Sequence, residues 1–79
     1  DLFAEGVARA RQGDASGALR AYQDLLNRFP ASPLAENAMV ERMRLQTSTP
    51  DGAKEAKRYL ARYPRGFAVG EAQKLLAEP

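Results

Sequence analysis

The sequence contains no cysteine, no histidine and no tryptophan, and aromatic residues make up only 8% of its 79 positions. Without cysteine, the chain can form neither a disulfide nor a thiolate metal site. Without histidine, it lacks the commonest general base and the commonest metal ligand of proteins. No run approaches the roughly 18 apolar residues of a membrane-spanning helix. We therefore expect no enzyme activity, no metal, no cofactor, no small-molecule substrate and no membrane-spanning segment.

Charge of one sign is also scarce. Twelve basic and ten acidic side chains give a formal net charge of +2, with −1 over residues 1–40 and +3 over residues 41–79. A nucleic-acid-binding surface usually needs a dense basic stripe. Nucleic-acid binding through Arg58, Arg62 and Arg65, beside Tyr59 and Tyr63, is therefore only a minor alternative.

The chain is rich in alanine, leucine and arginine, which favour helices, and it has few β-branched residues. Glycine and proline interrupt it sharply at four places. We therefore predict an all-α chain of five helices, at about 2–12, 15–29, 33–46, 50–63 and 67–77. Asp14, Ser32 and Thr49 are predicted N-caps, the last two followed by a proline in the first helical position.

Apolar residues recur at helical spacing and predict the buried faces. The predicted core residues of the second and third helices are Ala18, Tyr22, Leu25, Phe29, Ala35, Ala38, Met39, Val40 and Met43. Those of the fourth and fifth are Ala53, Ala56, Tyr59, Leu60, Tyr63, Phe67, Ala68, Ala72, Leu75 and Leu76. We expect Gly70 to allow close packing or to weaken the fifth helix, and the carboxylates of Glu36, Glu41, Asp51 and Glu55 to be solvated on exposed faces.

The chain repeats itself at an offset of 34 residues. This offset aligns Leu26-Asn27-Arg28-Phe29-Pro30 with Leu60-Ala61-Arg62-Tyr63-Pro64, and it relates Ala4, Ala38 and Ala72. A helix–turn–helix unit of this length resembles the tetratricopeptide repeat. Gly6, Ala18, Tyr22 and Pro30 match the positions of the small and large packing residues and the closing proline of that family.

The resemblance implies a right-handed α-solenoid of two repeats, about 1–31 and 32–65, with a trailing capping helix at about 66–79. The chain 1–79 would then be a single domain, cut from a larger protein. The stretch from Tyr22 to Ala38 is similar to the "YP-x-S" form of the repeat in bacterial envelope proteins. That likeness implies a bacterial envelope or regulatory protein, with the periplasm as its compartment.

Members of this family bind protein partners on the concave side of the stack, which the first helix of each unit lines. The equivalent positions in this chain form the predicted partner face: Phe3, Val7, Arg11, Leu34, Asn37, Glu41, Arg44, Leu45 and Glu71. Their mixture of apolar side chains and single charges suits a peptide or a helix. The alternative is a structural, oligomerisation or spacer domain in which Phe3, Val7 and Leu34 mediate self-association.

Overall fold

The computed structural model describes residues 1–77, which form five α-helices and no strand. The helices are α1 (Leu2–Arg11), α2 (Ala15–Arg28), α3 (Ala35–Leu45), α4 (Pro50–Arg62) and α5 (Val69–Ala77). The predicted all-α class and number of helices are confirmed for this range. The helix bounds agree within one residue, except that α3 and α5 begin two residues later than predicted. The last two residues of the predicted trailing helix, 78–79, lie outside the described residues.

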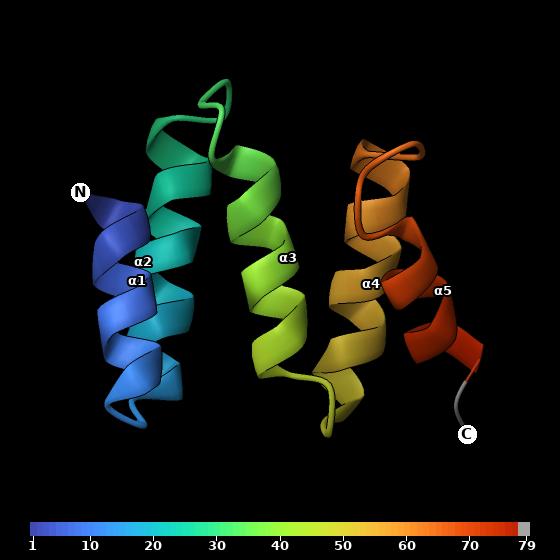
Figure 1. Cartoon of the computed structure of the whole chain (residues 1–79), viewed down its shortest axis with the longest axis horizontal. Helices are drawn as coiled ribbons and strands as arrows, with labels where there is room; N and C mark the ends of the chain where they lie inside the picture. Colours follow the sequence, from blue (N-terminus) through green and yellow to red (C-terminus); the bar gives the residue numbers. More distant parts are fainter. Residues whose placement is uncertain (78–79) are drawn as a thin grey trace.

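The helices follow one another in a row across the molecule, with α3 between the α1–α2 pair and the α4–α5 pair (Figure 1). Each helix packs mainly against the next one in the sequence. The row measures 33 × 27 × 16 Å along its principal axes. Because α1 and α5 lie at opposite ends of the row, the first and last helices do not close the array into a bundle.

The turn between α1 and α2 follows the sequence prediction. Gly13 has a φ of 80°, a left-handed conformation that favours glycine. Asp14 then caps α2, accepting hydrogen bonds from the Gly17 amide at 2.9 Å and from Arg9 Nη1 at 3.0 Å. These bonds, the Gly17 amide first, hold the pKa of the Asp14 carboxyl below its usual value. The short turn makes α1 and α2 antiparallel neighbours.

The predicted caps of α3 and α4 form differently. Ser32 is not the N-cap of α3, because a turn intervenes: its hydroxyl accepts from the Leu34 amide at 3.1 Å, and Leu34 becomes the N-cap. Thr49 is the N-cap of α4 and Pro50 follows it in the first turn, as predicted. The Thr49 hydroxyl does not cap the helix, however, because it donates to the Gln46 carbonyl at 3.0 Å.

Two apolar clusters hold the row together, and α3 contributes to both. The Tyr22 cluster consists of Ala18, Tyr22, Leu25, Ala35 and Ala38. The Tyr59 cluster consists of Val40, Met43, Ala56, Tyr59, Ala68 and Ala72. Both tyrosines are almost completely buried. The small residues around them let the helices approach closely, so each cluster centres on one large ring.

Glycines mark two of the closest approaches. A Cβ at Gly6 would overlap the Tyr22 ring, so glycine is the residue that lets α1 lie against α2, as the sequence predicted. A Cβ at Gly52 would overlap the Gln46 carbonyl, which brings the start of α4 against the end of α3. Gly70 has open space around it, and the prediction that it serves close packing is wrong.

Several predicted core residues are not in the core. The side chains of Phe29 and Phe67 are 54% and 61% exposed, because both residues lie in loops just outside the helices. The buried stripe of α4 is Gly52, Glu55, Ala56 and Tyr59, whereas the predicted Ala53, Leu60 and Tyr63 are only half-buried. Leu76 is also exposed. Ala56, Tyr59, Ala68 and Ala72 are buried as predicted, so the predicted faces of α4 and α5 are correct at their centres and too wide at their edges.

Candidate interaction surface

The predicted partner face draws on α1, α3 and α5, the odd-numbered helices of the row. Phe3 and Leu45 are half-buried and pack against the Tyr22 cluster, and the Phe3 ring centroid lies 5.6 Å from that of Tyr22. Val7 is half-buried, and Leu34 is 38% exposed. Phe3, Val7 and Leu45 therefore offer only part of their surface to a partner.

Three charged members of the face meet in one cluster across α3 and α5. Arg44 donates to both carboxylate oxygens of Glu71, from Nε and Nη2, each at 2.9 Å. Its Nη1 donates to Glu41 Oε2 at 3.1 Å. The Arg44 and Glu71 side chains remain 47% and 40% exposed. This bidentate pair joins two helices that are far apart in the sequence while its groups stay in reach of a partner.

The charges of this cluster shift the titration of their neighbours. The hydrogen bonds from Arg44 lower the pKa of Glu71, and Glu71 in turn raises the pKa of the Arg44 guanidinium. Burial raises the pKa of the Tyr22 hydroxyl, and the negative charge of Glu41 raises it further. The negative charge of Glu41 therefore influences the Tyr22 hydroxyl as well as Arg44.

The remaining polar members of the face, Arg11 and Asn37, are not hydrogen-bonded to this cluster. The side chains of Arg11 and Asn37 form no hydrogen bond or ion pair with any part of the chain that the structure describes. Arg11 is exposed and Asn37 is half-buried. Both side chains are therefore available to a ligand, but neither is positioned by a neighbour.

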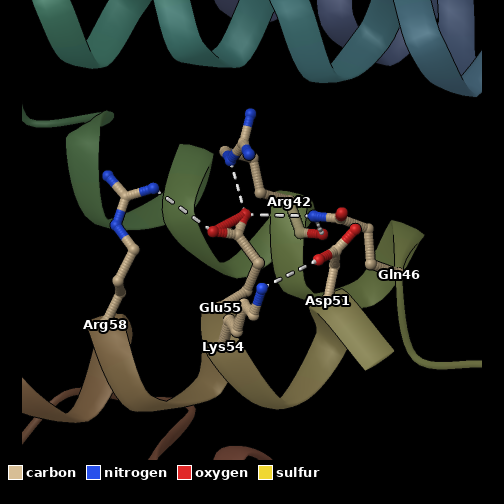
Figure 2. A pocket seen from close by; sticks show the side chains of 6 residues that line it. All are labelled: Arg42, Gln46, Asp51, Lys54, Glu55 and Arg58. Atoms are coloured by element: carbon tan, nitrogen blue, oxygen red, sulfur yellow. Dashed lines mark hydrogen bonds and ion pairs between the residues drawn. The ribbon is translucent and has the colours of Figure 1, made fainter. Parts of the chain in front are cut away.

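On another side of α3, a second polar cluster lines a depression of about 350 Å³ (Figure 2). Glu55 points from α4 toward α3, accepting from Arg42 Nε at 2.5 Å and from Gln46 at 3.0 Å. Arg42 also donates to the Leu19 carbonyl of α2 at 2.9 Å. Arg58 approaches the other carboxylate oxygen, and Lys54 pairs with Asp51 at the rim. Because the Glu55 and Arg42 side chains are only 8% and 16% exposed, this cluster fastens α2, α3 and α4 together.

The prediction that the carboxylates of Glu36 and Glu55 are solvated is wrong. Glu55 shares the buried stripe of α4 with Ala56 and Tyr59, and that helical spacing was the available sequence signal. Glu36 accepts from the Tyr59 hydroxyl at 2.7 Å and from the Phe67 amide at 3.2 Å. The Tyr59 hydroxyl also accepts from the Ala68 amide at 3.0 Å. Burial raises the pKa of Tyr59, and the bond to Glu36 adds to this rise.

In both alternative surfaces, the self-association surface and the nucleic-acid surface, some of the predicted residues are covered within the fold. Phe3 and Val7, expected to mediate self-association, are half-buried against their own chain. Tyr59, expected beside the arginines of a nucleic-acid surface, is completely buried and cannot stack on a base. Arg58 is engaged by Glu55 at 3.3 Å.

Residues 1–77 include no group of three or more His, Cys, Asp or Glu side chains placed to hold a metal. No helix in this range has the length and apolar character to span a membrane. No protein-family model, curated protein or solved structure matches the chain.

Proposed function

We propose that the chain is a tetratricopeptide-like α-solenoid domain that acts as a non-enzymatic protein–protein interaction module. The 34-residue offset in the sequence supports this fold. So do the open row of sequentially packed helices and the close contact that Gly6 allows with Tyr22. In this interpretation α1–α2 and α3–α4 are the two repeats and α5 is the capping helix. The "YP-x-S" resemblance supports a bacterial cell-envelope or regulatory parent protein and favours the periplasm or cell envelope as its compartment.

The proposed partner face is the side formed by α1, α3 and α5, and the observation that carries it is the Glu41–Arg44–Glu71 cluster. An exposed ion pair contributes only about 0–1 kcal/mol to stability, because water and salt screen it. When a partner covers such a pair, the same charges act in a lower dielectric and become stronger and more directional. Half-exposed, geometrically ordered charges are therefore better placed for recognition than for holding the fold.

The partner that this face fits is a peptide or a helix. Its apolar members, Phe3, Val7, Leu34 and Leu45, expose small areas, and its charges are isolated from one another outside the ion cluster. Such a surface suits the side chains of an extended or helical segment, which alternate in polarity. It does not suit a small-molecule substrate, which usually binds in a deep and largely apolar pocket.

Peptide selection followed by NMR mapping tests this proposal. A random 12-residue peptide library is panned against the full chain, and selected peptides are titrated into the ¹⁵N-labelled protein. We expect amide shifts in α1, α3 and α5 first, and at least fivefold weaker binding to an Asn37→Ala/Arg44→Ala variant. The matched control is Arg20→Ala/Lys57→Ala, which changes exposed side chains of α2 and α4. Shifts confined to α2 and α4 for every selected peptide would overturn the proposal.

Sedimentation distinguishes the module from a structural or oligomerisation domain. We expect a monomer over a wide concentration range, because Phe3 and Val7 are partly covered within the chain. Self-association that an Arg44→Ala change abolishes would show that the same face binds another copy instead of a different partner.

A further inference from the structure

Exposed apolar side chains gather at one end of the molecule. Phe29 and Leu34 lie in the α2–α3 loop, and Phe67 lies in the α4–α5 loop, with exposures of 54%, 38% and 61%. Both loops are at the same end of the row, at the top of Figure 1. The Phe67 amide donates to Glu36, which lies two residues beyond Leu34, so the two loops meet at the start of α3. The apolar residues therefore belong to one surface.

Three exposed arginines lie at the same end of the molecule, at the ends of α2 and α4 and in the α4–α5 loop. The guanidinium carbon of Arg28 lies 5.9 Å from the ring centroid of Phe29, and that of Arg62 lies 4.9 Å from that of Tyr63. Arg65 lies in the α4–α5 loop. All three are exposed, and none forms an ion pair with the residues that the structure describes. We define the loop-end surface as Arg28, Phe29, Leu34, Arg62, Arg65 and Phe67.

The carboxylates at this end are already engaged. Asp1, at the start of α1, accepts from the Ala4 amide at 2.8 Å. Glu36 accepts from the Tyr59 hydroxyl and the Phe67 amide. The three guanidinium groups therefore have exposed donors and no carboxylate partner within the described residues. Such groups complement an anionic ligand that also offers apolar contacts to the phenylalanine rings.

The connections at the opposite end of the molecule differ in their apolar content. Residues 12–14 and 46–49 contain no aromatic or large aliphatic side chain. Asp14 pairs with Arg9 and Asp51 with Lys54 there, whereas Arg11 is exposed and forms no ion pair within the described residues. Exposed aromatic rings beside several unpaired guanidinium groups are thus a property of one end and not a general feature of the loops.

We propose that the loop-end surface binds a protein segment in which acidic side chains alternate with aromatic or aliphatic ones. A flat anionic bilayer would attract the arginines but would also repel the carboxylates of Asp1 and Glu36 at the same end. A peptide avoids this repulsion, because each of its carboxylates can lie beside one arginine. A nucleic-acid strand needs a continuous basic groove, and three arginines on two loops do not form one. This site is separate from the Glu41–Arg44–Glu71 cluster and shares only Leu34 with the predicted partner face.

The test uses the full chain and two loop-end variants, Arg28→Gln/Arg62→Gln/Arg65→Gln and Phe29→Ser/Phe67→Ser. A random 12-residue peptide library is panned on the wild type after depletion on the arginine variant. We expect the surviving peptides to be enriched in Asp and Glu together with Phe, Leu or Trp. Their binding should weaken at least tenfold in each variant and should fall as NaCl rises from 50 to 300 mM. Amide shifts should centre on residues 28–34 and 62–68.

The matched control is Arg20→Gln/Lys57→Gln/Lys74→Gln, which removes three exposed cations elsewhere and changes the net charge equally. It should bind the selected peptides as the wild type does. The inference is overturned if no acidic peptides are enriched, or if the control weakens binding as much as the loop-end variants. Tighter binding to phosphatidylglycerol vesicles or to oligo-dT than to the peptides would also overturn it. Loss of binding in Asn37→Ala/Arg44→Ala alone would support the partner face and contradict this site.

Discussion

Arg42 and Arg44 lie two residues apart on α3, so their side chains leave the helix about 200° apart. Arg42 is 16% exposed and joins α2 and α4 through the Leu19 carbonyl and the 8% exposed Glu55. Arg44 is 47% exposed and joins α5 through Glu71, which is 40% exposed. The same residue type with the same kind of partner thus occurs in a buried and in an open setting on one helix.

Because the two ion pairs differ in exposure, the loss of a charge has different consequences for stability on the two sides of α3. On the Arg42 side, removal of either charge leaves the other buried without its main ionic partner, and this is strongly destabilising even though Gln46 and Arg58 still reach Glu55. On the Arg44 side, water can replace a lost partner, so the loss for stability is small. The Arg42 side therefore holds the row of helices, while the Arg44 side is free to exchange its contacts with a ligand.

The largest effect is expected from a charge placed between the two sides, at Ala38. This residue is completely buried in the Tyr22 cluster, so Ala38→Asp would bury a carboxylate without a partner. We expect a loss of about 3–5 kcal/mol, enough to unfold a small domain of ordinary stability. Far-ultraviolet circular dichroism measures the loss of helix. Ala8→Asp, an exposed site in α1, has the same helix-propensity cost and should remain folded.

The next effect is that of Arg42→Met, which leaves the Glu55 carboxylate without its main partner. We expect the free energy of unfolding to fall by about 3 kcal/mol, because Glu55 stays buried and the bond to Leu19 is lost. Urea denaturation measures this change. A second substitution, Glu55→Leu, should restore much of the stability. If Arg42→Met were as stable as the wild type, the Arg42 side would not be what holds α2 to α4.

A smaller loss is expected at the start of α5. Tyr59→Phe removes the hydroxyl that donates to Glu36 and accepts from the Ala68 amide. Glu36 keeps its hydrogen bond from the Phe67 amide, so the Ala68 amide is the buried group left unpaired, at a cost of about 1–3 kcal/mol. Amide hydrogen exchange should accelerate most at residues 66–72. Tyr22→Phe is the control, since the Tyr22 hydroxyl forms no hydrogen bond within residues 1–77. Equal acceleration in both variants would show that ring packing, not the Glu36 bond, positions α5.

The smallest effect concerns the pH dependence of the Arg44 side. Arg44 lowers the pKa of Glu71 in the folded chain, whereas the ordinary value is 4.5. The stabilisation is therefore complete above that value and is lost as the pH falls through the lower, folded pKa. Because both groups are largely exposed, we expect less than about 1 kcal/mol. Urea midpoints of the wild type and Glu71→Gln should differ at pH 7 and converge below pH 4.5. If the difference in urea midpoint persisted in strong acid, the Arg44–Glu71 ion pair would not be its cause.

Much of the fold could be predicted from the sequence, because its signals are local. Gly13, Asp14 and Pro50 set helix ends through backbone chemistry that does not depend on the rest of the molecule. The place of Glu55 in the buried stripe of α4 was missed, since Glu55 takes a core position only when Arg42 of α3 and Gln46 just beyond it reach the carboxylate. Phe29 and Phe67 were misplaced for a related reason: the helical period ends one residue before Phe29 and begins two residues after Phe67.

The candidate site was predictable only in part. The offset of 34 residues placed Asn37 and Glu71 at equivalent positions, and it is the interaction of Glu71 with Arg44 that the structure adds. A sequence pattern can assign Arg42 and Arg44 to opposite sides of a helix. It cannot say which of the two meets a buried carboxylate, because that depends on how α4 and α5 pack.

The most direct measurement compares Arg42→Met with Arg44→Met in two assays on the same preparations: urea denaturation and binding of a peptide selected on the wild type. We predict that Arg42→Met loses about 3 kcal/mol of stability. Arg44→Met should keep its stability within about 1 kcal/mol and bind the peptide at least fivefold more weakly. An Arg44→Met chain that is as unstable as Arg42→Met, or that binds every selected peptide as tightly as the wild type does, would contradict the account. In either case the Arg42 side would not be the one that stabilises the fold, or the Arg44 side would not be the one that binds the partner.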